Sequence, residues 1–343
     1  MNSDIQNIRW GILGTGKIAQ NFACSLAEIN SAVKQSVVSR NPDHAVWFSQ
    51  KFGFTHAHRT LDEFFNDPEI DVIYIATPTN LHYEHCLQAL NSGKAILCEK
   101  PFTRSWEEAS QVVEKARSCG LFCMEAMWMR FNPFIQECRK LIQDQHIGKV
   151  CSVNIGIGYQ KDLSKLGQPE DGHGAMLGFG CYALSLAFFL FGEPQNYQCQ
   201  LICTDAGVDV NCAVILIYPH HTVSISISIN TTNSNDVHIF GTDGSIYIPS
   251  PFIDATDMRV LSNKSPRMGL TQRIGRKLTR IAKPITSLLP QSTNPASIGL
   301  IREAEETMRC LRLGLKESPV MPLNESLLIH QLLDKIKSSA VLN

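Results

Sequence analysis

A glycine-rich turn between an apolar segment and a helical one constrains the fold of this chain more than any other feature. Residues 8–13, IRWGIL, form a predicted strand, and residues 17–29 form a predicted helix. Between them, Gly14-Thr-Gly16-Lys-Ile-Ala19 matches the G-x-G-x-x-G/A fingerprint of dinucleotide-binding turns. For such a motif taken alone, a chance glycine-rich turn is the alternative, so the surrounding sequence has to decide.

Each position of this motif has a physical role beside a pyrophosphate. Gly14 permits the tight turn, Gly16 lets the backbone approach the anion, and Ala19 lets the helix pack closely on the strand. The helix N-terminus, with Lys17 and Ile18 in its first turn, faces the phosphates with its amide groups and the positive end of its dipole. We therefore expect this turn and the first residues of its helix to bind a dinucleotide.

Strand-like and helical segments alternate through the first 125 residues. Asn41 before Pro42 has the pattern of a helix N-cap followed by proline in the first turn. The alternation predicts a parallel sheet with helices on both faces, a doubly wound Rossmann domain in which ligands bind at the carboxyl ends of the strands. The further predicted strands are 33–39, 71–77, 94–99 and 121–126, and the predicted helices between them are 42–52, 61–66, 81–91 and 106–118.

Length and composition indicate a folded, two-domain protein. The 343 residues suffice for two domains, and 44% hydrophobic with 18% charged residues excludes a disordered chain. The net charge of −1 gives no overall field for nucleic acid or anionic membrane, and we expect neither a nucleic-acid partner nor a metal site. No apolar run approaches the ~20 residues that span a bilayer, and the first ten residues are polar. Twelve cysteines without a C-x-x-C pair are typical of free thiols in a cytoplasmic protein.

The end of the second predicted strand indicates which nicotinamide cofactor is preferred. Domains that bind NAD usually carry an acidic residue there, which holds the ribose 2′-hydroxyl. This chain has Ser39-Arg40 instead, and a hydroxyl with a guanidinium suits a 2′-phosphate. Asp43 follows shortly afterwards, so the pattern favours NADP without excluding NAD.

Two further strand ends carry polar residues where a nicotinamide would meet its substrate. One reads ATPTNLH (76–82) and offers Thr77, Pro78, Asn80 and His82, and the other reads Glu99-Lys100-Pro101. The Lys100 ammonium can bind a substrate hydroxyl and favour loss of its proton, while Glu99 can hold the lysine in place. The alternatives are a solvated ion pair at a strand end for Glu99 and Lys100, and a surface polar group for His82.

At this point the chain resembles the Gfo/Idh/MocA oxidoreductases, whose signature joins the glycine-rich turn to an E-K-P at the fifth strand. Within that family it is most similar to the dimeric dihydrodiol dehydrogenases, which also act as NADP-dependent D-xylose dehydrogenases. The stretches that carry the likeness are AILCEKPFT (95–103), ARSCGLFCMEAMWMRFNP (116–133) and GLKESPVMPLNES (314–326). The resemblance implies a Rossmann domain over 1–125 and a substrate-binding, dimerising α/β domain over 126–343, with an open, mostly antiparallel sheet. The proline of this motif is often cis in relatives, so the resemblance implies a cis bond before Pro101. C-terminal helices within 296–340 can pack back on the first domain.

The second half of the chain supports that layout independently. A predicted helix over 132–148 is followed by strands with short connections, which favours antiparallel pairing. The segment 221–230 alternates strictly between apolar residues and serines, so its serine face meets either water or a second subunit. The predicted strands are 150–159, 196–204, 211–218, 221–230 and 236–242.

The resemblance also points to a helix after residue 172, where relatives carry D-x-x-x-Y or D-x-x-x-H facing the nicotinamide. Tyr182 matches the second position, and a phenol near Lys100 could relay the substrate proton. The first position departs from the pattern, because Gly178 stands in place of the aspartate. Either the substrate differs, or His173 or Asp171 substitutes, or catalysis is weak or absent. A buried aromatic on an apolar helix is the alternative for Tyr182.

Two other groups of residues remain as candidates. Glu125, Trp128 and Arg130 follow the sixth strand, where an aromatic wall and a guanidinium could meet a sugar, although a structural role is the alternative. Residues 264–283 contain seven Lys or Arg and no acid, with apolar residues at helical spacing. They predict a helix that either covers the sheet or contacts an anionic membrane or acidic partner weakly.

These observations favour an NAD(P)-dependent oxidoreductase, with NADP preferred. It would move a hydride between nicotinamide and a secondary alcohol or hemiacetal of a sugar, cyclic polyol or dihydrodiol, with Lys100 and Tyr182 handling the proton. The alternative, motivated by Gly178, is a non-catalytic NADP-binding protein in regulation or assembly. A homo-oligomer through the C-terminal sheet is expected in either case.

Overall fold

The computed structural model describes residues 7–165, 174–262, 283–284 and 297–339. The chain divides into two compact units. Of the described residues, the first unit contains 7–131 and 297–338, and the second contains 132–165, 174–262, 283–284 and 339. The predicted basic helix within 264–283 lies outside the described residues, except for Lys283.

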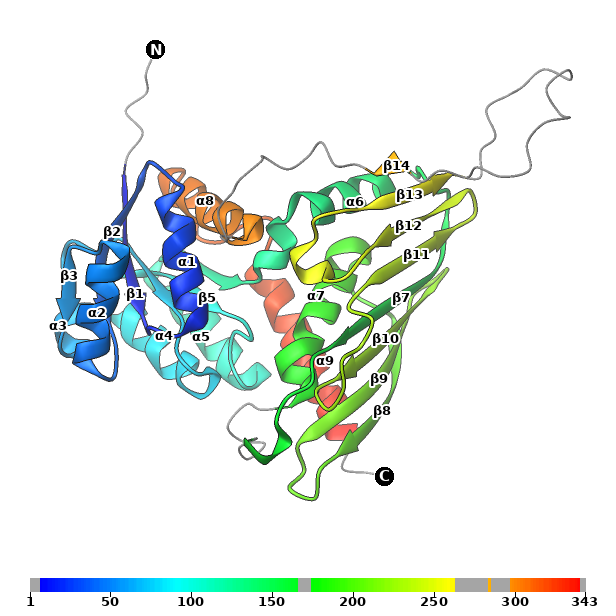
Figure 1. The fold of residues 1–343 in the computed structure, drawn as a ribbon, viewed down its shortest axis with the longest axis horizontal. Helices are drawn as coiled ribbons and strands as arrows, with labels where there is room; N and C mark the ends of the chain where they lie inside the picture. Colours follow the sequence, from blue (N-terminus) through cyan, green and yellow to red (C-terminus); the bar gives the residue numbers. More distant parts are fainter. Residues whose placement is uncertain (1–6, 166–173, 263–282, 285–296, 340–343) are drawn as a thin grey trace, which may run out of the picture. The chain divides into compact units, whose positions relative to one another are not determined.

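The first unit is built on a six-stranded parallel sheet in the order β3-β2-β1-β4-β5-β6, the order of a doubly wound dinucleotide-binding domain (Figure 1). The chain order reverses between β1 and β4, and each ends close to the glycine turn. The strands are β1 (Ile8–Leu13), β2 (Ala32–Val38), β3 (His56–His58), β4 (Val72–Ile75), β5 (Ala95–Glu99) and β6 (Cys123–Ala126).

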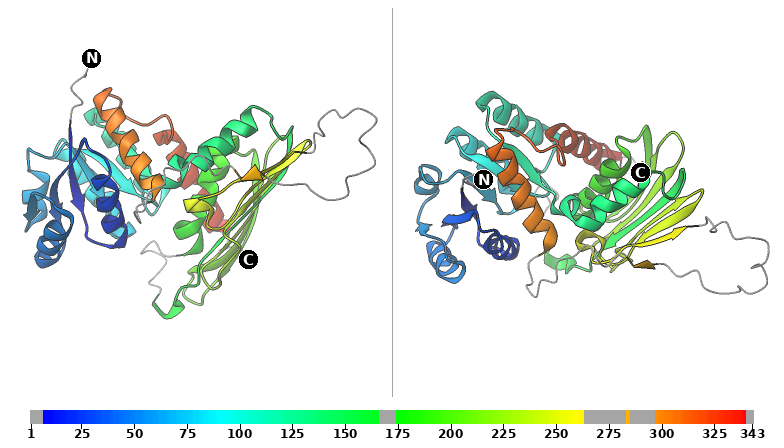
Figure 2. Two further views of the ribbon diagram at one scale, coloured as in Figure 1. Left: turned by 45° about the horizontal axis from the view of Figure 1, so that its top comes forward. Right: turned by 90° about the horizontal axis from the view of Figure 1, so that it is seen from above.

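Helices cover both faces of this sheet (Figure 2). Helices α1, α2 and α8 pack together on one face, while α3, α4 and α5 bury their apolar sides with the start of α9 on the other. Asn41 caps α2 through the amide of Asp43 as predicted, and Thr60 and Ser105 cap α3 and α5. The helices are α1 (Lys17–Ala27), α2 (Pro42–Phe52), α3 (Leu61–Phe65), α4 (His82–Asn91), α5 (Trp106–Cys119), α8 (Ile298–Arg312) and α9 (Leu323–Ser339).

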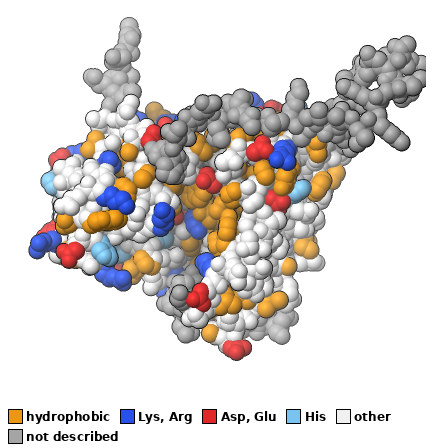
Figure 3. Space-filling model, viewed as in Figure 1, with side chains coloured by type: hydrophobic (Ala, Val, Ile, Leu, Met, Phe, Trp, Pro, Cys, Tyr) orange, Lys and Arg blue, Asp and Glu red, His pale blue; other side chains and the backbone are white. Residues whose placement is uncertain are grey.

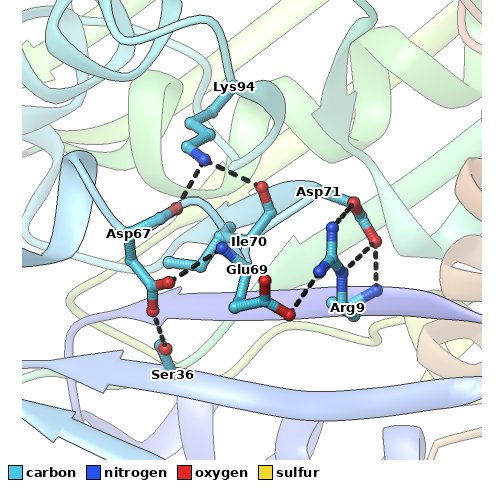
Figure 4. Close-up of polar contacts among 7 residues, drawn as sticks. All are labelled: Arg9, Ser36, Asp67, Glu69, Ile70, Asp71 and Lys94. Carbon is cyan, nitrogen blue, oxygen red and sulfur yellow. Dashed lines mark hydrogen bonds and ion pairs between the residues drawn. The ribbon is translucent and has the colours of Figure 1, made fainter.

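A polar network holds the amino ends of the central strands (Figure 4). The Arg9 guanidinium on β1 donates to both carboxylate oxygens of Asp71, which directly precedes β4. The buried Lys94 ammonium, just before β5, donates to the carbonyl oxygens of Asp67 (2.6 Å) and Ile70 (3.0 Å). These bonds fix the strands at the edge opposite the ligand-binding ends.

The second unit contains an eight-stranded sheet in the order β14-β13-β12-β11-β7-β10-β9-β8. All its pairings are antiparallel except that of β7 with β10, which is parallel, so the sheet is mixed and mostly antiparallel as expected. The strands are β7 (Val150–Gly158), β8 (Asn196–Cys203), β9 (Asp209–Ile217), β10 (Thr222–Ser228), β11 (Val237–Gly241), β12 (Gly244–Ile248), β13 (Arg259–Ser262) and β14 (Lys283–Pro284).

One face of this sheet is covered and the other is open. Helices α6 (Pro133–Gln143) and α7 (Cys181–Phe191) lie on the covered face, and within the described part of this unit no helix lies on the other (Figures 1 and 2). In β10, Val223, Ile225 and Ile227 are buried, while Ser224 and Ser226 are exposed. The predicted alternation of this strand is confirmed, although Ser228 at its end is buried.

The chain has nearly equal numbers of basic and acidic residues, 31 and 32. On the face shown in Figure 3, basic and acidic side chains are interspersed. Among the described residues, no helix is both long enough and apolar enough to cross a membrane.

Candidate active site

The two glycines of the first turn differ in what surrounds them. Gly14 has a φ of +108°, and a Cβ there would lie 2.6 Å from the carbonyl oxygen of Ala76 at the end of β4. A side chain at Gly16 would meet no described protein atom within 4 Å, and no side chain caps α1, whose N-cap is Gly16. The packing of the protein therefore requires Gly14. Gly16 leaves open space at a helix N-terminus, which fits the pyrophosphate of a dinucleotide.

The end of β2 places hydroxyls beside this turn. The Thr15 hydroxyl lies 3.2 Å from the Ser39 hydroxyl, so the two loops meet. Arg40 follows, with its side chain exposed to solvent. Since β2 adjoins β1 in the sheet, this exposed guanidinium lies at the edge where the adenosine ribose of a bound dinucleotide is expected.

Glu99 at the end of β5 is buried beneath Lys100. The Tyr74 hydroxyl on β4 donates to Glu99 Oε1, and the Lys100 amide donates to Oε2 at 3.1 Å. Burial raises the pKa of Glu99 to about 7, although the bond from Tyr74 opposes the rise. Glu99 is only 5% exposed, which excludes the alternative of a solvated surface ion pair. The Lys100–Pro101 peptide bond is cis, as the resemblance implied.

His82, at the start of α4, is a buried residue rather than a surface group. Its Nδ1 lies 2.9 Å from the Pro101 carbonyl oxygen and its Nε2 lies 2.8 Å from that of Thr77. Burial lowers the pKa of His82, while its contacts with these two carbonyl groups oppose that shift. The imidazole thereby links the two loops that follow β4 and β5. In the first of these loops, Pro78 directly precedes a short 3₁₀ turn over Thr79–Leu81, and Asn80 lies within that turn.

The structure places Glu125 within β6 rather than after it, and Trp128 and Arg130 follow that strand. Two of these three residues, Glu125 and Arg130, are enclosed within the first unit. Glu125 Oε1 accepts the Phe102 amide at 3.2 Å. The Arg130 guanidinium is fully buried, and its Nη2 lies 2.6 Å from Glu325 Oε1. Burial on this scale favours the structural alternative for both residues. Trp128, which packs against Gly299 of α8, stays a candidate for substrate contact.

Sequence reasoning missed a buried carboxyl group next to this cluster. Glu303 on α8 is 0% exposed, and neither of its carboxylate oxygens has a hydrogen-bond partner among the described residues. Burial, followed by repulsion from Glu99 and Glu125, raises the pKa of Glu303 well above its ordinary range. The acid therefore lies close to the Lys100 loop, although about 200 residues separate the two in the chain. A glutamate within an amphipathic helix gives no local sign of such an environment.

Tyr182 lies in the first turn of α7 in the second unit and is buried. A π-helical turn, Met176–Gly180, precedes α7, and Asp209 Oδ2 on β9 accepts the Met176 amide at 2.6 Å. π-Helical turns inside helices often occur at functional sites. Gly178 lies in this turn, four residues before Tyr182. His173 and Asp171 lie outside the described residues.

Two family profiles match the chain in the order that the fold indicates. One, described as an oxidoreductase family with an NAD-binding Rossmann fold, matches residues 8–127. The other, a GFO/IDH/MocA C-terminal domain, matches residues 135–247. The chain belongs to the Gfo/Idh/MocA oxidoreductase family, and it is an oxidoreductase with an NAD(P)-binding Rossmann domain.

Individual relatives are similar over nearly the full length. Trans-1,2-dihydrobenzene-1,2-diol dehydrogenase of Mus musculus is 31% identical over 342 residues, covering 97% of this chain and 96% of the relative. The enzyme of the same name from Danio rerio is 31% identical over 340 residues, with 96% of each chain covered.

Solved structures share the fold at lower identity. Levoglucosan dehydrogenase in complex with NADH and levoglucosan has a TM-score of 0.84, at 22% identity over 98% of both chains. KijD10, a 3-ketoreductase from Actinomadura kijaniata in complex with NADP and TDP-benzene, has a TM-score of 0.80, at 20% identity over 97% of this chain and 98% of that one.

Proposed function

We propose that this protein is an NADP-preferring dehydrogenase or reductase that interconverts a secondary alcohol and a carbonyl on a sugar, cyclic polyol or dihydrodiol. The observation that carries the proposal is the position of Lys100, directly after β5. Its amide donates to the buried Glu99, and His82 links the loop after β5 to the loop after β4. Relatives named as dihydrodiol dehydrogenases, and solved structures named for levoglucosan and a 3-keto sugar, support this substrate class.

The proposed chemistry removes a hydride and a proton from one CH–OH group. The glycine turn would hold a dinucleotide, whose nicotinamide would supply the acceptor for the hydride. The Lys100 ammonium holds the substrate oxygen and stabilises the charge that develops on it as the O–H bond breaks. Tyr182 relays that proton to solvent, and in the reductive direction the same groups return it to the carbonyl oxygen. Trp128 is the proposed apolar contact for the substrate ring.

The proposed preference for NADP rests on Ser39 and the exposed Arg40 at the end of β2. A guanidinium binds phosphate oxygens bidentately and gains no such contact from a 2′-hydroxyl. The twelve cysteines, none of which forms a disulfide, support a reducing, cytoplasmic setting.

We also propose that two copies associate through the open face of the second sheet. Ile202, Ile215, Phe240 and Leu261 are all among the exposed large apolar residues of the protein. The strand register aligns Ile215 with Ser224, and Phe240 with Ser152, which places these side chains on that single open face.

The direct test follows NADP⁺ and NAD⁺ reduction by absorbance across aldopyranoses, inositols and dihydrodiols, and the reverse reaction with keto-sugars. We expect turnover with NADP⁺ on at least one substrate class. In Arg40→Met, the Kd for NADP⁺ should rise about 10–100-fold, the loss of a charged hydrogen bond, while the Kd for NAD⁺ changes little.

Two results would contradict the proposal in different ways. NADP⁺ binding without turnover in either direction would favour the non-catalytic alternative, a regulatory or assembly role. Equal effects of Arg40→Met on both cofactors would remove the stated basis for NADP preference.

A further inference from the structure

Glu99 is a buried acid whose charge is balanced between opposing influences. Burial favours the neutral carboxyl group. The bond that the Tyr74 hydroxyl donates to Oε1, the charge of Lys100, and the bond from the Lys100 amide to Oε2 at 3.1 Å all favour the carboxylate. Together they leave the pKa of Glu99 at about 7. A further charge placed near this carboxyl group would therefore change its ionisation at neutral pH.

The neighbouring acids Glu125 on β6 and Glu303 on α8 are also buried. A Cβ at Gly299, four residues before Glu303, would lie 2.7 Å from the Trp128 carbonyl oxygen. Since residues four apart share one face of a helix, Glu303 lies on the α8 face that packs on the 3₁₀ turn after β6. Burial raises the pKa of Glu125, and it raises that of Glu303 well above its ordinary range. An ionised Glu303 is strongly disfavoured, so Glu99 is the better placed of the two to change charge near pH 7.

The other ionisable groups of the surrounding elements titrate outside this range. Burial lowers the pKa of His82 on α4, and it lowers that of His330 on α9 to about 4. Burial also raises the pKa of the Cys98 thiol, directly before Glu99, well above its ordinary range. The Arg130 guanidinium, which lies 2.6 Å from Glu325 Oε1, keeps its proton at any pH that the protein meets. A change of charge in this group near neutral pH is therefore assigned to Glu99.

The two redox forms of a nicotinamide cofactor differ by one positive charge on the ring, while their adenosine and phosphate parts are the same. Lys100 is the proposed contact of the reacting substrate oxygen, and its amide already bonds Glu99. At an effective dielectric constant of about 20, a unit charge within about 10 Å changes the proton affinity of a carboxyl group about tenfold or more. A charge of that size is sufficient to tip the balance at Glu99.

We propose that Glu99 is a proton-binding site coupled to the redox state of the cofactor, and that it loses its proton when the oxidised cofactor binds and regains it when the ring is reduced. The inference rests on the proposed function, because it takes the nicotinamide to bind beside Lys100. The proton that leaves Glu99 goes to solvent and returns from solvent. Because such coupling is reciprocal, NADP⁺ binds more tightly relative to NADPH as pH rises through the range where Glu99 titrates.

The test measures the Kd for NADP⁺ and for NADPH by calorimetry between pH 6 and pH 8.5, without substrate. The ratio of the two Kd values cancels the contacts to the shared phosphates. We expect this ratio, NADP⁺ over NADPH, to fall about threefold or more across the range. In Glu99→Gln the ratio should no longer depend on pH, whereas Glu303→Gln should keep the dependence because Glu303 is already neutral. Glu305→Gln, on the exposed side of α8, is the matched control and should behave as wild type.

Calorimetry in two buffers of different ionisation enthalpy counts the protons directly in wild type, so the test does not depend on the folding of Glu99→Gln. At pH 7, NADP⁺ binding should release about 0.3–0.5 of a proton more than NADPH binding. Equal proton counts, or a pH dependence that survives in Glu99→Gln or disappears in Glu303→Gln, would overturn the role of Glu99 and leave the oxidoreductase intact. Failure to bind either cofactor would count against the proposed function itself.

Discussion

Glu303 belongs to a group of buried acids that includes Glu99 and Glu125, all in the first unit. An ionised carboxylate without hydrogen bonds would be strongly destabilising in such a place, so the folded protein keeps Glu303 protonated near neutral pH. Neutral His330 on α9 lies nearby, with its Nε2 4.0 Å from Glu125 Oε1 and its pKa lowered by burial to about 4. Burial therefore sets the protonation states beneath the Lys100 loop.

The substitution Glu303→Gln should make the protein more stable at pH 8 than the wild type. A carboxyl group whose folded-state pKa is raised contributes stability fully below its unfolded pKa of about 4.5, and that contribution declines as pH rises toward the folded value. The decline is about 1.4 kcal/mol per pH unit within that window, and glutamine, which does not ionise, lacks it.

Urea denaturation of both proteins from pH 4 to pH 8 measures this difference. We expect a gap close to zero at pH 4 that widens as pH rises. Glu305→Gln, on the exposed side of α8, controls for loss of a glutamate from the helix. A gap that stays constant over this range would show that Glu303 is ionised in the folded protein.

At the scale of single elements, the turn between β1 and α1 contains two glycines with different proposed roles. Protein packing requires Gly14, whereas Gly16 leaves room for the dinucleotide. Gly14→Ala should lower stability by about 1–3 kcal/mol, because a Cβ clashes with the Ala76 carbonyl and the φ of +108° is strained. Gly16→Val should leave the melting temperature nearly unchanged and weaken NADP⁺ binding at least tenfold. Calorimetry with and without NADP⁺ tests both variants, and a large stability loss in Gly16→Val would contradict the proposed role of that residue.

The elements that the sequence predicts best are those with strong local signals. The boundaries of α2 follow from Asn41 and Pro42, and the apolar runs locate β1, β2, β4 and β5 within one or two residues. The predicted helix over 132–148 was too long, since α6 ends at Gln143. The strands β3, β12, β13 and β14 were not predicted, because the three-residue HAH and the other short, polar-interrupted segments become strands only through pairing with a neighbour.

At the scale of the whole molecule, the open sheet predicts self-association. We expect light scattering to give the mass of a dimer or tetramer, and Ile215→Lys should shift the protein toward monomer by placing a charge within the apolar face. Leu313→Lys, a 62% exposed position outside this sheet, should have no effect. A monomeric wild-type protein at micromolar concentration would contradict the proposal.

The candidate site could be predicted only as far as local motifs reach. The glycine turn, Glu99-Lys100-Pro101 and Tyr182 were identified because each lies at a strand end or helix start with a characteristic pattern. Glu303 was missed because its surroundings come from segments remote in sequence, with α8 lying beside the β5 loop. The burial of His82, Glu125 and Arg130 likewise depends on tertiary packing.

The most direct test of the central claim measures turnover and NADP⁺ affinity in the same samples of wild type, Lys100→Met and Tyr182→Phe. If Lys100 and Tyr182 handle the substrate proton, both variants should bind NADP⁺ within about threefold of wild type. Their kcat should fall by about 10²–10⁴-fold, the usual contribution of a positioned acid–base group. Undiminished turnover in Lys100→Met would contradict the account.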